Sequence, residues 1–338
     1  MGVREIGDPA RGEGRAGGYG RAWEEGRARA GGEGAGVAAG GGGACAECAG
    51  CGPDGADRWA HDGEGAANGP VDYLVSGEWS QKAAKAAQAA GAKVNIVANT
   101  EAANFDHSTA PAEWKLDPNA AYLHVCSNET VHGHRLPQWP THPNLIVDAS
   151  SEFMSRPHPV KDAALVYAGA QKNLGPAGVV VAIVRKDWYA RIGKQVASIF
   201  NFAKLAEAKS MVNTPPTFGI YILLETFRWL EKQGGLAAVE KVNEQKASLI
   251  YDAIDGSEGF YSGTVARVDQ RSRMNVTFRL PSEEVTEAFI KDASKLGMVA
   301  LKGYRTVGGI RASIYNAMPV EGCQALATFM KDFAAKRG

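Results

Sequence analysis

The chain has 338 residues, which is enough for two domains and a sizeable hydrophobic core. Its 37 Lys and Arg residues balance 37 Asp and Glu residues, and this zero net charge argues against a general role in binding nucleic acid or a membrane surface. No apolar run is long enough for a transmembrane helix, and the start lacks the apolar stretch of a secretory signal. We therefore expect a cytoplasmic protein, with a plastid as the alternative.

Residues 1–70 differ sharply from the rest of the chain. They hold 22 of the 41 glycines and contain neither Leu nor Phe, so they cannot bury enough apolar surface to offset the entropy of ordering a backbone. We expect this low-complexity segment to be disordered or poorly packed. Two origins compete for this segment: a wrongly translated or misassembled start, and a genuine divergent or truncated protein. An organelle transit peptide is a third, less favoured origin.

The cysteines do not suggest a disulfide scaffold. Cys45, Cys48 and Cys51 could be metal ligands, but no fourth ligand follows at a standard spacing, so we prefer chance and expect no metal. Cys126 and Cys323 lie in apolar surroundings and are expected to be reduced core residues.

From residue 71 onward, short apolar runs alternate with helical stretches, which is typical of an α/β protein. Continuous apolar runs indicate strands buried on both faces of a mainly parallel sheet. The predicted strands are 71–76, 93–98, 121–126, 144–149, 164–168 and 178–184, and the predicted helices are 81–90 and 218–233. We assign residues 71–235 to this large domain.

The remaining residues, 236–338, predict a small C-terminal α+β domain. A long amphipathic helix at 236–254 leads into strands at 274–280 and 309–315, with helices at 285–296 and 321–336.

Lys172 is the leading candidate for chemistry. It follows a buried strand and precedes a glycine-rich turn, and ligands of open α/β sheets bind at the carboxyl ends of strands. A lysine against an apolar sheet end loses hydration, which lowers its pKa and makes it a better nucleophile toward an aldehyde. The alternative is an ordinary surface lysine.

Three other residues lie at strand ends. Asp148 could pair with a protonated pyridine nitrogen, or it could cap the turn that follows it. Trp79 could stack on a cofactor ring or belong to the core or its rim. Thr130 could donate a hydrogen bond to a cofactor or cap a helix or turn.

Several long motifs in the chain resemble those of the phosphoserine aminotransferase family, whose members are class V, fold-type I enzymes dependent on pyridoxal phosphate. The resemblance runs from about Val71 to the end, which is about four fifths of the chain. The motifs that carry it are Ser76–Trp79, Asn128–Thr130, Asp148–Ser151, Ser155–Pro157, Ala168–Asn173, Asn213–Thr217 and Gly308–Asn316.

The resemblance implies a role for each residue at the cofactor. Lys172 would hold pyridoxal 5'-phosphate as a Schiff base and shuttle the proton between substrate and cofactor, and Asp148 would pair with the pyridine nitrogen. Trp79 would stack on the ring and Thr130 would hydrogen-bond the cofactor. Gln171 would contact the cofactor phosphate.

Other residues would bind substrate or reach across a dimer. Asn213 and Thr214 would contact the cofactor phosphate of the other subunit, which implies a homodimer with shared active sites. Arg311 would clamp the substrate α-carboxylate through a bidentate pair, and Arg305 would help to bind the second anionic group. Tyr304 stands where the family commonly has a histidine, which leaves the affinity for phosphate open.

The implied reaction transfers an amino group from glutamate to 3-phosphohydroxypyruvate in serine biosynthesis. The family also has segments before Val71 that are not recognisable in residues 1–70: a glycine-rich phosphate loop, a His-Arg pair and a Ser-Gly-Pro start. The large domain is therefore expected to be incomplete at its N-terminus. Two alternatives are another class V enzyme, such as an alanine–glyoxylate aminotransferase or a cysteine desulfurase, and a non-catalytic remnant of the fold.

Overall fold

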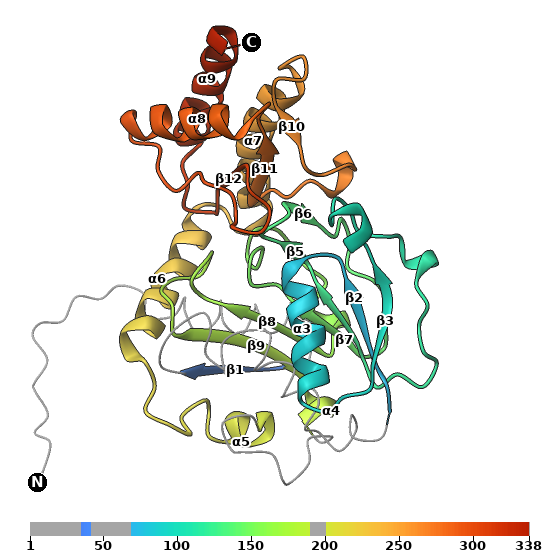
Figure 1. The fold of residues 1–338 in the computed structure, drawn as a ribbon. Coiled ribbons are helices and arrows are strands. Elements are labelled where there is room, and N and C mark those ends of the chain that lie inside the picture. The colour runs from blue at the N-terminus through green and yellow to red at the C-terminus, as the bar shows by residue number, and fades with distance from the viewer. Residues whose placement is uncertain (1–34, 42–68, 190–200, 338) are drawn as a thin grey trace, which may run out of the picture.

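The computed structural model describes residues 35–41, 69–189 and 201–337 (Figure 1). Its largest element is a seven-stranded sheet with the order β1-β9-β8-β7-β4-β2-β3. The strands are β1 (Ala35–Gly41), β2 (Val71–Val75), β3 (Val94–Asn99), β4 (Leu123–Cys126), β7 (Leu145–Asp148), β8 (Leu165–Gly169) and β9 (Val179–Arg185).

The prediction of a mainly parallel sheet is confirmed. β8, β7, β4, β2 and β3 run parallel to one another in that spatial order. At one side β9 pairs antiparallel with β8, and β1 pairs antiparallel with β9. Every residue of β2, β4, β7 and β8 is buried, as their continuous apolar runs indicate. All six predicted strands are present, with ends shifted by one or two residues.

Strand β1 lies within residues 1–70, the segment for which the sequence predicts disorder or poor packing. It pairs with β9 in a continuous register from Ala35 opposite Arg185 to Gly41 opposite Val179. A strand ladder is made by main-chain groups, so a run of Gly and Ala can form one without apolar side chains to signal it. Cys45, Cys48 and Cys51 lie outside the described residues, as does most of the segment in which no phosphate loop was recognised.

Helices flank this sheet. The helices are α3 (Glu78–Ala89), α4 (Lys186–Tyr189), α5 (Phe202–Glu207) and α6 (Thr217–Lys232). Helix α3 follows β2 directly and buries a face of small residues, Ala83, Ala84 and Ala87, against it. A short hairpin, β5 (Asn128–Glu129) and β6 (His134–Arg135), follows β4 and was not predicted.

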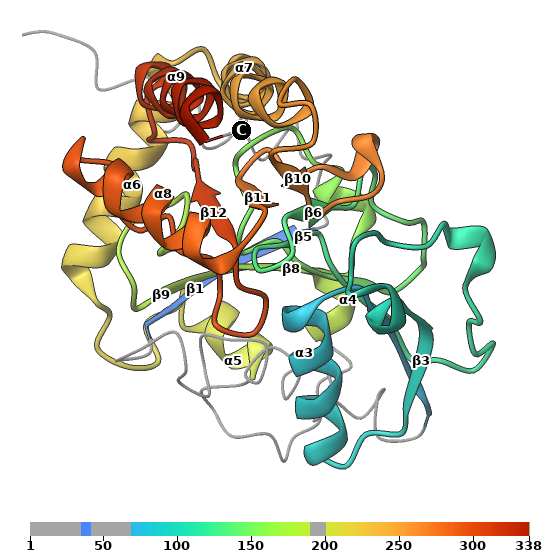
Figure 2. The ribbon, with the colours of Figure 1, turned by 45° about the horizontal axis from the view of Figure 1, so that its top comes forward.

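The C-terminal part forms a smaller α+β unit at the top of Figure 1. A three-stranded sheet of β10 (Ser262–Gly263), β11 (Asn275–Arg279) and β12 (Ile310–Ser313) packs with α7 (Leu236–Asp255), α8 (Glu283–Lys295) and α9 (Val320–Arg337). Phe278 and Phe289 lie fully buried in its core. Figure 2 shows α7 and α9 side by side over this sheet.

The apolar core of this unit shares no residue with the two clusters around the large sheet. We propose on this basis that the domain boundary lies between Gly235 and Leu236, as the sequence predicts. Among the described residues, no helix is both long enough and apolar enough to cross a bilayer.

Candidate active site

Four adjacent parallel strands bring the predicted cofactor residues to one edge of the large sheet. The strands β8, β7, β4 and β2 are neighbours in that order. Lys172 follows β8 and Asp148 ends β7. Thr130 lies four residues after β4, directly beyond β5, and Trp79 lies in the first turn of α3, which follows β2. Parallel strands end at the same edge, so residues separated by almost a hundred positions are collected there.

Lys172 lies at the centre of this group. Its Nζ donates a hydrogen bond of 2.9 Å to Oγ1 of Thr130. The same Nζ lies 5.5 Å from the ring centroid of Trp79 and over its face. The indole and the hydroxyl therefore both border the amine that the sequence predicts to be the nucleophile.

Asp148 is buried, and burial raises the pKa of its carboxyl group above the ordinary value. The positive charge of Lys172 opposes that shift, as do hydrogen bonds from Ser150, whose backbone N–H donates to Oδ1 at 2.9 Å. Asp148 therefore caps the turn that follows it, as one of its two interpretations predicts. This role is compatible with the second interpretation, in which its carboxylate pairs with a protonated pyridine nitrogen. Burial outweighs these stabilising contacts, so the carboxylate would be stabilised further by a cation beside it, and a protonated pyridine nitrogen is such a cation.

Arg311 lies on the face of the small sheet that is turned toward this group. It is directly opposite Thr277 in the β11–β12 pair, so the two side chains share a face. The Thr277 hydroxyl donates to the carbonyl oxygen of His132 at 2.8 Å, two residues beyond Thr130. The Nε atom of Arg311 is buried and has no hydrogen-bond partner within the described structure, which suits a side chain that awaits an anion.

The remaining predicted residues do not join the Lys172 group in this single chain. Gln171, Asn213, Thr214 and Arg305 are all exposed. Gln171 folds back over Gly169, where its Oε1 occupies the space that a Cβ would need. The guanidinium of Arg305 lies 6.0 Å from the ring of its neighbour Tyr304.

Sequence reasoning missed the polar residues that support this site. Asn173 is buried beside Lys172, and its Oδ1 accepts a 3.0 Å hydrogen bond from the backbone N–H of Asn316 in the small unit. Asn128 joins the hairpin to β11, because its Nδ2 donates to Oδ1 of Asn275 at 3.0 Å. Both residues lie in motifs that carry the family resemblance, and that is the signal that could have found them.

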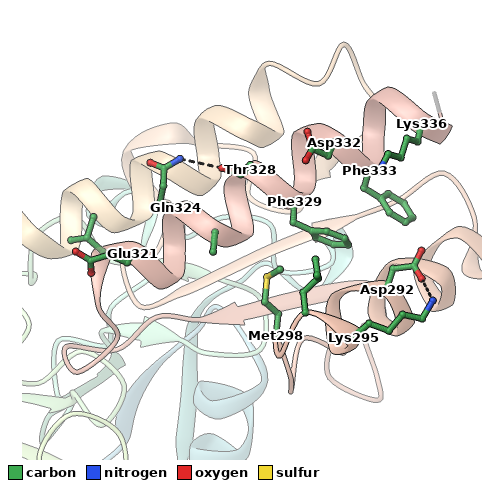
Figure 3. Close-up of a pocket in the computed structure, with 13 residues that line it drawn as sticks. Asp292, Lys295, Met298, Glu321, Gln324, Thr328, Phe329, Asp332, Phe333 and Lys336 are labelled. Carbon is green, nitrogen blue, oxygen red and sulfur yellow. Dashed lines mark hydrogen bonds and ion pairs between the residues drawn. The ribbon is translucent and has the colours of Figure 1, made fainter.

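A separate hollow lies at the far side of the small unit, between α8 and α9 (Figure 3). Its floor is apolar, with Met298, Phe329 and Phe333. The Nζ atom of Lys295 forms an ion pair with Oδ1 of Asp292 at 2.7 Å. None of the predicted site residues lines it. The hollow is therefore distinct from the Lys172 group.

Comparison with known proteins places this geometry in a family. Residues 62–326 match the family model described as aminotransferase class-V. A phosphoserine aminotransferase of Niallia circulans is 48% identical over 270 residues, which cover 79% of this chain and 74% of that protein. One of Herpetosiphon aurantiacus is 45% identical over 273 residues, with the same coverage of both chains.

Solved structures agree with the sequence relatives. A phosphoserine aminotransferase from Bacillus circulans superposes with a TM-score of 0.84 at 43% identity, covering 90% of this chain and 82% of the other. The PLP-bound enzyme from Trichomonas vaginalis gives 0.81 at 33% identity, with 93% and 89% covered. An alanine–glyoxylate aminotransferase from Nostoc reaches 0.68 at 17% identity, which shows the shared fold alone.

The expected fold class is thereby confirmed as the fold-type I α/β architecture with pyridoxal phosphate as cofactor. This chain belongs to the class-V aminotransferases and, within them, to the phosphoserine aminotransferase family.

Proposed function

We propose that this chain transfers the amino group of glutamate to 3-phosphohydroxypyruvate, with Lys172 as the catalytic lysine. The observation that carries the proposal is the group formed by Lys172, Thr130, Trp79 and Asp148 at the ends of four adjacent strands. The relatives at 45–48% identity, which carry the name phosphoserine aminotransferase, support the choice of substrates.

The residues present fit pyridoxal phosphate. When bound, this cofactor supplies an electron sink for the charge left on the substrate α-carbon. Lys172 offers an amine that a hydroxyl already orients, and in the reaction its Nζ would carry the proton taken from that carbon. Trp79 presents a flat apolar face, and Asp148 presents a buried negative charge for the ring nitrogen.

Substrate binding falls to the arginines. Arg311 has an unpartnered buried Nε and stands on the face toward the Thr130 turn, so we assign it the α-carboxylate common to both substrates. Arg305 is exposed and free to move toward the second anionic group. Gln171 is assigned to the cofactor phosphate; its exposed side chain must turn away from Gly169 to reach it.

We further propose a homodimer in which Asn213 and Thr214 complete the partner's site. Both are exposed in the single chain and immediately precede α6. Large apolar side chains on α6 are also exposed, with Phe218 at 72% and Tyr221 at 55%. Apolar side chains three residues apart share one helix face, and such a face favours burial against a second copy. The cytoplasmic location expected from the sequence stays a prediction.

Absorbance of the purified protein tests the proposal. With added pyridoxal phosphate, the chain should show a visible band that Lys172→Ala abolishes. Lys161→Ala, which removes an exposed lysine outside the site, should leave the band unchanged. Added glutamate should then convert the visible band, and 3-phosphohydroxypyruvate should restore it.

A band that forms but does not respond to glutamate would contradict an aminotransferase. If no band forms, the chain does not hold the cofactor, and the alternative of a non-catalytic protein with this fold takes its place. Conversion by glutamate without restoration by 3-phosphohydroxypyruvate would point to another class V substrate.

A further inference from the structure

Glu129 is a buried acid for which the reaction as described has no use. It is fully buried in the hairpin strand β5, one residue before Thr130. Its Oε2 accepts a 3.1 Å hydrogen bond from the backbone N–H of Trp79. Its Oε1 accepts bonds from Ser80, at 2.9 Å from the backbone N–H and 2.6 Å from the hydroxyl. The carboxylate is thereby tied to the first turn of α3, about fifty residues earlier in the chain.

The hydroxyl of Ser80 donates its single proton to this carboxylate. Ser80 Oγ accepts hydrogen bonds from the N–H groups of Ser76 at 2.9 Å and Gly77 at 3.0 Å, which occupies its lone pairs. Its proton is left to donate, and Glu129 at 2.6 Å is closer than the carbonyl of Gly77 at 3.2 Å. Three donors therefore converge on two carboxylate oxygens, at a helix N-terminus that favours negative charge.

Gly77 makes this approach possible. A Cβ at position 77 would lie 2.3 Å from the carboxyl carbon of Glu129, far inside van der Waals contact. The backbone there is fully extended, with a φ of −178°, so any residue could adopt it. Position 77 therefore requires glycine because the carboxylate occupies the space that a Cβ would need, and not because of its backbone conformation.

The two ends of Glu129 reach the two side chains that border Lys172. Through its carboxylate it holds the amide of Trp79, whose ring faces the Lys172 amine. Through the backbone it carries Thr130, whose hydroxyl accepts from the same amine. We propose that Glu129 is a positioning residue that fixes the Trp79 indole and the Thr130 hydroxyl relative to each other, so that both meet the cofactor at a set geometry. The proposal rests on the proposed function only in taking pyridoxal phosphate as the ligand.

Glu129→Gln tests this with little change in shape. An amide has one oxygen, so whichever way it turns, its NH2 group faces either the Trp79 N–H or the donors of Ser80. We expect the dissociation constant of pyridoxal phosphate to rise about tenfold or more, the effect of losing one charge-assisted hydrogen bond. The visible circular dichroism of the bound cofactor should change as well. Glu78→Gln is the matched control, because Glu78 lies in the same turn but pairs with Lys82 at 3.2 Å.

Gly77→Ala provides a second, independent perturbation, since it displaces the carboxylate without removing it. It should reproduce both changes. If Glu129→Gln fails to fold, Ser80→Ala replaces it; that variant removes the 2.6 Å bond and should weaken cofactor binding to a smaller extent.

A double-mutant cycle with Thr130→Val separates positioning from a general loss of stability. If Glu129 acts through Thr130, the two substitutions together should weaken cofactor binding less than the product of their separate effects. The proposal is overturned if the effects multiply, or if Glu129→Gln lowers only the melting temperature and leaves affinity and circular dichroism unchanged. A wild-type chain that binds no cofactor would contradict the proposed function instead.

Discussion

The amide of Asn173 should contribute more to stability than its small size suggests, because it joins the two units beside Lys172. Its Nδ2 donates to the carbonyl of Phe153 at 3.0 Å, and its Oδ1 accepts from the N–H of Asn316 at 3.0 Å. Asn173→Ala leaves both backbone groups buried without these partners. Each orphaned group costs about 1–3 kcal/mol, so the free energy of unfolding should fall by about 2–6 kcal/mol.

Such a loss is a large part of the roughly 5–15 kcal/mol that stabilises a typical protein. Urea unfolding of the cofactor-free chain measures it, with Asn119→Ala as the control because Asn119 is exposed. The midpoint should shift strongly for the first variant and hardly for the second. A shift below about 0.5 kcal/mol for Asn173→Ala would show that the contact between the units does not depend on this amide.

Three other substitutions test separate parts of the account. Arg311→Lys keeps the charge but loses the bidentate geometry, so steady-state kinetics should show the KM for glutamate rising about tenfold or more while cofactor retention is unchanged. Phe218→Ser on α6 should shift sedimentation toward the monomer, whereas Leu296→Ser, exposed on the small unit, should not. Lys246→Met tests a buried amine whose Nζ donates to the carbonyls of Ile314 at 3.0 Å and Tyr315 at 2.8 Å.

Burial lowers the pKa of Lys246 from 10.5 to about 8. Between these values the unfolded chain holds a proton that the folded chain has released, so this group makes stability rise with pH from about 8 to 10.5. The free energy of unfolding gains about 3 kcal/mol from this group above pH 10.5, and this gain is lost progressively as the pH falls from 10.5 through 8. Urea unfolding across this range should give a slope of stability against pH that is more positive in the wild type than in Lys246→Met, since Cys323, Tyr251 and Tyr261, whose pKa values burial raises, contribute an opposite slope in both proteins. An equal slope in both would contradict the burial of a charged amine.

Strand and helix periodicity predicted most of the fold, because buried parallel strands are continuous apolar runs. The elements that escaped prediction are short or carry no such pattern, and they include α4, α5 and β10. β1 is made of Gly, Ala and a single Val, and its partner strand β9 supplies the order. The hairpin β5–β6 has two residues in each strand, too few for any period to show.

The site shows a similar division. Lys172, Asp148, Thr130 and Trp79 could be predicted to lie near one another because each stands at or beyond the end of a recognisable strand, and parallel strands end at the same edge of a sheet. The start of α3 was placed three residues late, at 81 in place of Glu78. Its N-terminal N–H groups are satisfied by Glu129 from a distant segment, so no capping side chain stands next to the helix in sequence.

Local sequence patterns cannot identify hydrogen-bond partners that lie far away in the chain. The stabilising role of Asn173 depends on Asn316, and that of Glu129 depends on α3. Both residues stand among other polar residues in the sequence, and only the fold shows that they are buried and which groups they bind.

Reductive trapping tests the central claim most directly. Borohydride treatment of the cofactor-loaded protein fixes the cofactor to the lysine that holds it, and peptide mass mapping then identifies that lysine. The account predicts modification of the peptide that contains Lys172. Lys246 is the clearest competitor, because burial lowers the pKa of its amine to about 8. Attachment at Lys246, or at any lysine other than Lys172, would contradict the assignment of the active site.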